Sequence, residues 1–215
     1  MADPDDPHRG QPVLNAGAPI AEASGAVIML HGRGANAADI IGLAQVIDRP
    51  EIAYLAPDAA GHVWYPRPFM APAVSNQPYL SSALNIVGRL IVDLIDHGIP
   101  AERVALLGFS QGACLALEYA ARNPRRYGAV LALSGGLIGD RIALENYAGS
   151  LAGTPVFVGC SDVDPFIPLE RVQESIAVMA HLEADVTERI YPGAAHTIVA
   201  DEVQKVQRIL DLMIF

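Results

Sequence analysis

The sequence predicts an α/β fold in which a mostly parallel central sheet is flanked by helices, and three observations lead to this prediction. Short, continuously apolar runs recur along the chain, as is typical of strands buried on both faces of a parallel sheet. Longer segments with helical spacing of apolar residues separate these runs, and strands that alternate with helices pair in parallel. The chain has 215 residues, of which 52% are hydrophobic and 18% are charged, which fits a packed globular domain.

Six apolar runs are the candidate strands. In chain order they are 26–31 (AVIMLH), 51–57 (EIAYLAP), 103–109 (RVALLGF), 128–134 (GAVLALS), 155–160 (PVFVGC) and 186–191 (VTERIY). The last run alternates more than the others, and segment 11–25 is expected to hold an edge strand. The helical patterns are 36–48, 79–97, 110–123, 169–181 and 197–212. Asn36 is a suitable N-cap for the first of these helices, and Gly98 is a stop signal for the second.

Composition and charge limit the setting and the partners. The formal net charge of −10 argues against nucleic acid and against stable association with anionic membranes, and it keeps the protein soluble. Two cysteines do not make a disulfide framework, and neither a signal peptide nor a membrane-spanning run is expected, so we expect a cytoplasmic protein. Residues 1–10 are acidic and proline-rich and predict a flexible tail, and residues 11–215 are expected to form one domain.

The segment 59–78 (AAGHVWYPRPFMAPAVSNQP) is the exception to the alternation. It contains several prolines and the single Trp in one irregular connection. A long loop in a compact domain is either disordered or functional, and the aromatic residues favour an ordered flap over a site. The alternative is a surface loop that is packed by its own side chains.

The stretch Gly108-Phe109-Ser110-Gln111-Gly112 has the pattern G-x-S-x-G between a predicted strand and a predicted helix. In this pattern the strand turns so sharply into the helix that flanking side chains would clash, and the serine hydroxyl stands exposed near the positive end of the helix. The pattern indicates that Ser110 is a nucleophile. The alternative is that Ser110 only caps the helix.

A serine hydroxyl needs an adjacent base, and the expected chain order is serine, then acid, then histidine. His196 follows the last predicted strand and reaches the same edge of the sheet, whereas His181 falls inside a helical pattern. The carboxylate should follow the strand before that, where Asp162 and Asp164 both occur. Either one could orient the imidazole, and local physics does not separate them. The other would be a turn residue that binds backbone N–H groups.

Two backbone N–H groups are expected to stabilise the oxyanion of an acyl-transfer reaction. One belongs to Gln111, which follows the nucleophile, and the other to Arg33 in the early glycine-containing loop LHGRGAN. For the guanidinium of Arg33 two interpretations remain, a solvated loop charge or a partner for an acidic substrate group.

Five segments in order, LHGRGAN, GFSQGA, LALSGGL, DPFIP and YPGAAHTI, resemble the phospholipase/carboxylesterase family of the α/β-hydrolases, which includes acyl-protein thioesterases. The resemblance runs from about Val27 to the C-terminus and implies an α/β-hydrolase fold and a serine hydrolase that needs no cofactor. It places the nucleophile and base on Ser110 and His196, and it favours Asp164 because the family's acid precedes a proline. The segment WYPRPFMAP looks more like the bacterial carboxylesterases than the eukaryotic thioesterases.

The remaining histidines and cysteines fit structural roles. The histidines are scattered, so no metal site is expected, and no nucleotide-binding glycine motif is present. His31 should hold its loop by hydrogen bonds, and Cys114 should pack as a small buried thiol.

We therefore expect a carboxylesterase that cleaves small to medium, rather apolar esters through an acyl-enzyme, with Trp64, Tyr65, Phe69 and Met70 lining the substrate pocket. The first alternative is a thioesterase or lysophospholipase with the same three catalytic residues. A remote alternative is a binding protein that kept the fold and lost the chemistry. A homodimer that buries the aromatic flap is conceivable.

Overall fold

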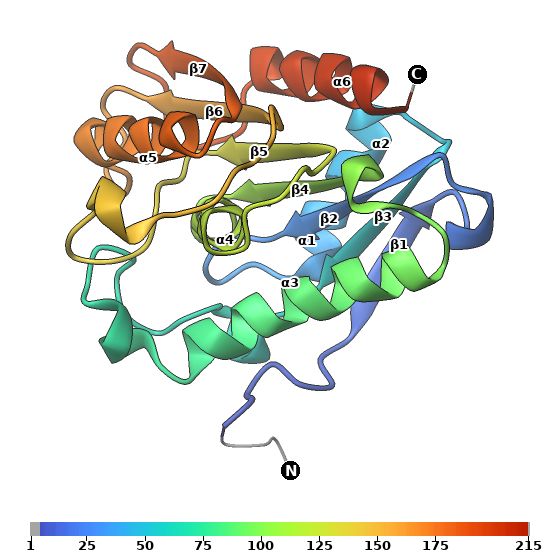
Figure 1. Ribbon diagram of the computed structural model, residues 1–215, viewed down its shortest axis with the longest axis horizontal. Coiled ribbons are helices and arrows are strands. Elements are labelled where there is room, and N and C mark those ends of the chain that lie inside the picture. Colours follow the sequence, from blue (N-terminus) through green and yellow to red (C-terminus); the bar gives the residue numbers. More distant parts are fainter. Residues whose placement is uncertain (1–4, 215) are drawn as a thin grey trace.

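A computed structural model describes residues 5–214, which fold around a seven-stranded sheet (Figure 1). The strands are β1 (Val13–Gly17), β2 (Gly25–Leu30), β3 (Ile52–Pro57), β4 (Val104–Phe109), β5 (Ala129–Leu133), β6 (Pro155–Ser161) and β7 (Asp185–Tyr191). Their order in the sheet is β1-β3-β2-β4-β5-β6-β7. Only β1 is antiparallel to its neighbour, and the other pairs are parallel. The predicted α/β fold and the edge strand are thus both present.

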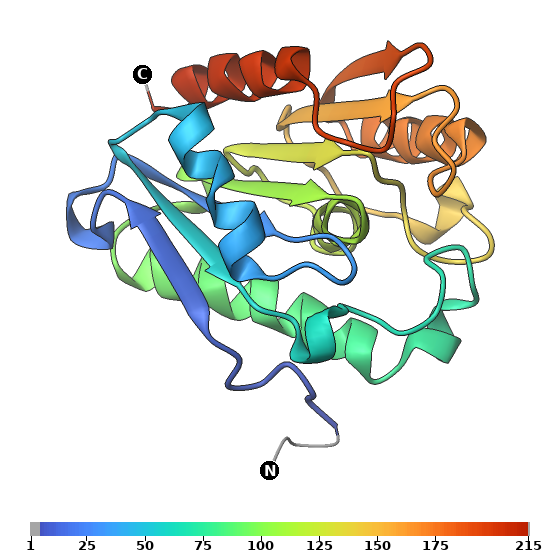
Figure 2. The ribbon, with the colours of Figure 1, turned by 180° about the vertical axis from the view of Figure 1, so that it is seen from behind.

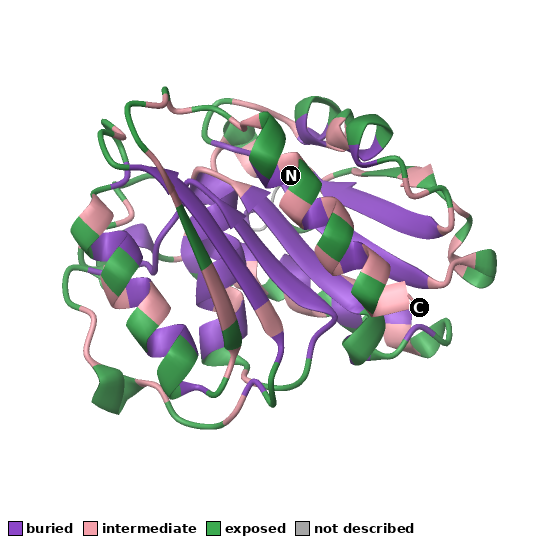
Figure 3. Ribbon diagram, turned by 90° about the horizontal axis from the view of Figure 1, so that it is seen from above, coloured by how far each residue is buried: buried purple, intermediate pink, exposed green. Residues whose placement is uncertain are grey.

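Helices cover both faces of this sheet (Figure 2). They are α1 (Ala37–Ile41), α2 (Leu43–Ile47), α3 (Tyr79–Asp96), α4 (Gln111–Arg122), α5 (Leu169–His181) and α6 (Ala200–Ile214). Short 3-10 helices occupy Ile20–Glu22, Ala60–His62, Ala73–Asn76, Ala101–Arg103 and Leu144–Asn146. Side chains from alternate strand positions form one core with α1, α2 and α6 and a second core with α3, α4 and α5. Strands β2 to β6 are consequently buried, whereas the edge strands β1 and β7 are partly exposed and most helices have an exposed outer face (Figure 3).

The helix predicted at 36–48 is divided in two. Asn36 caps α1 with a capping box, in which its side chain accepts the N–H groups of Ala38 and Asp39 while the Asp39 carboxylate accepts the Asn36 N–H. The chain then breaks at Gly42 and continues as α2, which ends at Asp48 with a left-handed φ of 52°. The predicted N-cap is therefore confirmed, whereas the single helix is two short ones.

The N-terminal segment differs from the predicted flexible tail. Residues 1–4 lie outside the described residues, but His8 is fully buried. Its backbone N–H donates to the Ser82 hydroxyl at 2.9 Å, and its ring bonds the Trp64 carbonyl and the Ala60 N–H. The Asp6 carboxylate pairs with Arg89 on α3 at 2.9 Å. Residues 6–8 are thus packed between α3 and the start of the segment 59–78.

The described helices contain no segment that combines the length and the apolar character needed to cross a bilayer.

Candidate active site

Ser110 lies in the sharp turn that joins β4 to α4. Its φ of 55° and ψ of −118° are unusual for a residue with a side chain, and its hydroxyl makes no capping hydrogen bond to the helix. A residue held in such a conformation costs about 1–3 kcal/mol, and surrounding packing has to enforce it. The turn therefore presents the hydroxyl outward instead of using it as a helix cap.

The two glycines that flank this turn are required by close approach of the backbone. A Cβ on Gly108 would lie 2.2 Å from the Gly112 carbonyl oxygen. A Cβ on Gly112 would lie 2.0 Å from the carbonyl oxygen of Leu30 at the end of β2. Neither contact can be relieved by moving a side chain, because both partners are backbone atoms. The two glycines of the G-x-S-x-G pattern thus allow α4 to lie this close to the sheet.

Ser110, His196 and Asp164 are joined by hydrogen bonds, although they are distant in sequence. The His196 Nε2 atom lies 2.9 Å from the Ser110 Oγ atom, and the Nδ1 atom lies 2.6 Å from the Asp164 Oδ2 atom. The Asp164 side chain is fully buried and that of His196 is 15% exposed. The rings of Phe109 and Phe166 pack against the imidazole at 4.9 and 5.0 Å between centroids.

The two candidate carboxylates have different partners. Asp164 uses its second oxygen to accept the N–H groups of Phe166 and Ile167, at 2.8 and 3.0 Å, so its orientation toward His196 is fixed. Asp162 instead accepts the Gly193 N–H at 2.7 Å. It thus anchors the start of the loop that carries His196. Of the two aspartates, Asp164 is the one that contacts the imidazole.

The structure brings Arg33 and Gln111, the two residues expected to supply the oxyanion donors, to the pocket of Ser110. Among residues 5–214 no hydrogen bond uses the Arg33 N–H. Gln111 is the first residue of α4, where N–H groups have no intrahelical acceptor. Each of these two residues thus has a backbone N–H without an acceptor among the described residues.

The side chains of the same two residues hold the segment 59–78 in place. The Arg33 guanidinium donates to the carbonyl oxygens of Tyr65, Pro66 and Arg67 at 2.9 to 3.2 Å. The buried Gln111 amide accepts the Trp64 N–H at 2.9 Å and donates to the Tyr65 carbonyl at 2.8 Å. Neither interpretation of the Arg33 charge from the sequence includes this role.

A pocket of about 600 Å³ opens above Ser110 and is mainly apolar. Tyr65 and Phe69 line it, as the sequence predicts. Trp64 is instead fully buried behind it, where its indole N–H donates to the His31 carbonyl at 2.9 Å. Met70 is 40% exposed and is also absent from the lining. Trp64 and Met70 therefore do not line the pocket, contrary to the prediction.

Sequence reasoning missed further lining residues. Those that lie next to the three hydrogen-bonded residues in sequence or in the flap are Phe109, Phe166, Ile167, Pro66 and Pro68. Their positions beside Ser110, Asp164 and the predicted flap residues were the available signal. The flap also matches its alternative interpretation in part, because the Asn76 side chain accepts the Arg67 N–H at 2.7 Å and packs the loop on itself.

The buried His31 and Cys114 have structural partners. His31 Nδ1 donates to the Gly32 carbonyl at 2.8 Å and Nε2 accepts the Ala59 N–H at 3.1 Å, while burial lowers the pKa of the ring. Burial raises the pKa of the Cys114 thiol to about 12, which keeps it protonated and unreactive. The described residues contain no cluster of three side chains suited to a metal ion.

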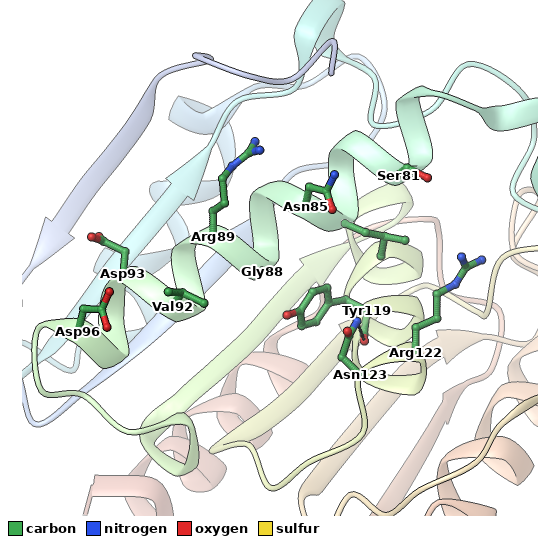
Figure 4. Close-up of a pocket in the computed structure, with 11 residues that line it drawn as sticks. Ser81, Asn85, Gly88, Arg89, Val92, Asp93, Asp96, Tyr119, Arg122 and Asn123 are labelled. Atoms are coloured by element: carbon green, nitrogen blue, oxygen red, sulfur yellow. Dashed lines mark hydrogen bonds between the residues drawn. The ribbon is translucent and has the colours of Figure 1, made fainter. Parts of the chain in front are cut away.

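A second hollow, of about 770 Å³, lies between α3 and α4 and is lined by none of the predicted site residues (Figure 4). Its two arginines already have carboxylate partners, since Arg89 pairs with Asp6 and Arg122 pairs with Glu118 at 2.6 Å. Of these two hollows, the one at Ser110 is the one lined by a serine that is hydrogen-bonded to a histidine.

Comparison with known proteins gives consistent matches over nearly the whole chain. The sequence model of the phospholipase/carboxylesterase family matches residues 14–214. Acyl-protein thioesterase 1 of Saccharomyces cerevisiae is 28% identical, over 89% of this chain and 93% of that protein. The crystal structure of a phospholipase/carboxylesterase from Dyadobacter fermentans has a TM-score of 0.90 and 47% identity, over 94% of this chain and 96% of that one. Esterase PE8 has a TM-score of 0.76 and 25% identity, over 94% and 98%.

Proposed function

Because the chain belongs to the phospholipase/carboxylesterase family and is a hydrolase of the carboxylesterase and thioesterase type, we propose that it cleaves carboxylic esters through an acyl-enzyme on Ser110. The observation that supports this most strongly is the unbroken chain of hydrogen bonds from Ser110 Oγ through the His196 ring to Asp164.

In the proposed mechanism, His196 Nε2 takes the hydroxyl proton while Ser110 Oγ attacks the acyl carbonyl. Asp164 accepts the Nδ1–H bond, which fixes the tautomer and stabilises the imidazolium that forms. The N–H groups of Arg33 and Gln111 bind the oxyanion, and removal of one such donor typically costs about 10²–10³ in rate. His196 then protonates the leaving alcohol. Water, activated by His196 in the same way, then attacks the acyl-enzyme, and the acid is released as Ser110 regains its proton.

The pocket supports the proposed substrate class. Its volume of about 600 Å³ and its wall of phenyl rings, prolines and Ile167 suit a small to medium apolar acyl or alcohol group. Tyr65 and Phe69 form part of this wall from the flap side, and Phe109 and Phe166 from the side of His196.

Thioesters are the second candidate substrate, and the similarity to a protein named acyl-protein thioesterase 1 is the observation that favours them. The same attack on a thioester releases a thiol, which is a better leaving group and needs less help from His196. A lysophospholipid is a third candidate for the same residues.

Turnover of p-nitrophenyl esters of increasing chain length, an acyl-thioester and a lysophospholipid tests the proposal. We expect ester hydrolysis that decreases by at least roughly 10⁴-fold in Ser110→Ala, together with loss of labelling by a fluorophosphonate. Unchanged hydrolysis in Ser110→Ala contradicts the proposal. A folded wild-type protein that neither turns over these substrates nor reacts with the probe favours the binding-protein alternative.

A further inference from the structure

The loop that carries His196, residues 192–199, is fastened at both ends by a carboxylate. At its start, the Asp162 carboxylate accepts the Gly193 N–H at 2.7 Å. At its end, the Glu202 carboxylate on the first turn of α6 accepts the Val199 N–H at 2.9 Å. His196 lies midway, three residues from each fastened N–H. Neither carboxylate touches the imidazole, so each acts on the loop backbone.

Glu202 makes its contact from an unusual place for a glutamate. The residue is only 1% exposed, under the carboxyl end of β6. Gly159 on β6 provides the space, because a Cβ there would lie 2.2 Å from the Glu202 Oε1 atom. Strand β6 leads directly into the loop that carries Asp164. The carboxylate therefore lies between the strand that supplies the acid and the loop that supplies the base.

A buried carboxylate is costly unless it is compensated. Among the ion pairs of the described residues none includes Glu202. Burial and the neighbouring Asp201 raise the pKa of Glu202 to about 7, and the bond from the Val199 N–H opposes this rise. The burial of the Glu202 carboxylate without a cationic partner therefore indicates a role beyond packing.

We propose that Glu202 is a positioning residue, which holds the end of the 192–199 loop so that the His196 ring meets the Ser110 hydroxyl. This inference rests on the proposed function, since it concerns the base of that reaction. Glu202 does not touch substrate. A displacement of about 1 Å at a reacting group can cost about 100-fold in rate, so fastening the backbone is sufficient to matter.

The titratable groups that interact with Glu202 come from three elements: Asp201 on α6, Tyr191 on β7 and Cys160 on β6. Arg189 stands opposite Gly159 in the β6–β7 register, but its guanidinium donates to the Glu188 carbonyl. Burial keeps the Tyr191 and Cys160 groups protonated by raising their pKa values. Compared with Tyr191 and Cys160, Glu202 is thus the group whose charge changes near neutral pH, and its carboxylate is the one that accepts a hydrogen bond from the loop.

Two substitutions at the same position separate hydrogen bonding from packing. Glu202→Gln keeps an acceptor for the Val199 N–H, whereas Glu202→Leu has similar size and no acceptor. At about pH 8 we expect Glu202→Gln to retain kcat within about 3-fold and Glu202→Leu to lose kcat by roughly 10- to 100-fold, with KM within about 3-fold in both. The ratio of wild-type to Glu202→Gln kcat should fall toward one on acidification to about pH 6, because both then carry a neutral acceptor.

A third variant disturbs the contact between Glu202 and the Val199 N–H through a substitution on strand β6. Gly159→Ala would push the carboxyl away from the Val199 N–H without changing Glu202, and it should reproduce the kcat loss of Glu202→Leu. The proton on His196 Nδ1 supplies a readout that needs no turnover. Its downfield NMR signal should be kept in Glu202→Gln and weakened in Glu202→Leu.

The proposal is overturned if Glu202→Leu keeps wild-type kcat and the Nδ1 proton signal, or if the Gln and Leu variants are impaired equally. Failure of the proposed function gives a different result, namely wild-type protein without turnover and without fluorophosphonate labelling at Ser110. In that case the NMR comparison still decides whether Glu202 holds the ring in place.

Discussion

At the scale of single residues, the hydrogen bonds give neighbouring, chemically identical side chains different tasks. Asp162 and Asp164 are two positions apart and follow the same strand, so nothing in the sequence pattern separates them. The resemblance to the family favoured Asp164, and the structure joins that residue to His196. The distinction depends on where the 192–199 loop lies, which is set by contacts more than 30 residues away in the chain.

Substitution of these two carboxylates should therefore have unequal effects. Asp164→Asn removes the charge and presents an amide to Nδ1, which favours the wrong tautomer, and we expect kcat to fall by roughly 10³–10⁴-fold. Asp162→Asn retains an acceptor for the Gly193 N–H, so kcat should fall by no more than about 10-fold. Steady-state kinetics with a p-nitrophenyl ester measures both, and a larger loss in Asp162→Asn would reverse the assignment.

Gln111 has a side-chain role that the sequence did not predict. Its backbone N–H was predicted from its place after the serine, whereas the role of its side chain in binding Trp64 and Tyr65 was not. The partners lie 46 and 47 residues away and have no local signature. Trp64 was placed in the pocket lining for a similar reason, because an aromatic residue in the sequence is equally consistent with a pocket wall and with a buried core position.

Gln111→Leu should loosen the flap while leaving the backbone donor in place. The buried Trp64 N–H loses its partner, which costs about 1–3 kcal/mol of unfolding free energy. Because Tyr65 lines the pocket, KM for esters should rise more than kcat falls. Urea unfolding and initial-rate kinetics measure these effects, with Gln111→Glu as the variant that keeps the acceptor. A Leu variant with unchanged KM and stability would show that the flap needs no such anchor.

At the scale of elements, the parallel strands were the most predictable part of the molecule. Their buried positions demand continuously apolar residues, so the runs in the sequence agree with the observed strands to within one or two residues. Helix ends were less predictable because they depend on caps. The last helix was expected from Thr197, but α6 begins at Ala200, where Glu202 binds the Val199 N–H. The residues 197–199 thus belong to the loop that positions His196.

The contact between α4 and β2 should tolerate no side chain at Gly112. In Gly112→Ala the added Cβ would lie 2.0 Å from the Leu30 carbonyl oxygen, so the helix must move away from the sheet. We expect a loss of about 3 kcal/mol in unfolding free energy and a severe loss of activity, because Ser110 moves with the helix. Thermal unfolding and ester turnover test this expectation.

Gly88→Ala is the matched control, because Gly88 lies within α3 facing Tyr119 (Figure 4). Its added Cβ would meet only the Tyr119 side chain, with the hydroxyl oxygen at 3.3 Å. Alanine favours a helix over glycine by about 1 kcal/mol, so this variant should be as stable as the wild type or more so. Equal destabilisation of the two variants would mean that the close approach of α4 to β2 does not require glycine at position 112.

At the scale of the whole molecule, segments from both ends of the chain are fastened to the flap and the site. His8 binds the start of the flap, and α6 carries Glu202 beneath the His196 loop. Composition alone predicted a flexible tail at 1–10, because an acidic, proline-rich segment gives no local sign of partners 52 to 74 residues away. Hence the carboxyl edge of the sheet depends on long-range contacts that periodicity cannot reveal.

Stability should consequently respond to pH through groups of opposite sign. Burial lowers the pKa of His8 and of His31, so the unfolded chain takes up more protons below about pH 6.5 and stability is lost as the pH falls. Glu202 acts in the other direction. Its pKa rises from 4.5 to about 7 in the folded protein, so stability is lost as the pH increases between these values.

The His8 contribution can be measured by urea unfolding between about pH 8 and 5 in the Glu202→Gln background, where the Glu202 carboxyl is absent and the buried Glu118 is common to all variants. We expect the unfolding free energy to fall on acidification below about pH 6.5, by at most about 1.4 kcal/mol per pH unit for each buried imidazole. His8→Asn in the same background should have a shallower slope, whereas His181→Asn, on the exposed face of α5, should keep the slope. A stability that stays constant over this range, or an equal slope in the His8 variant, contradicts the prediction. An equal slope in the His8 variant would mean that the N-terminal segment separates from the flap before the imidazole is protonated.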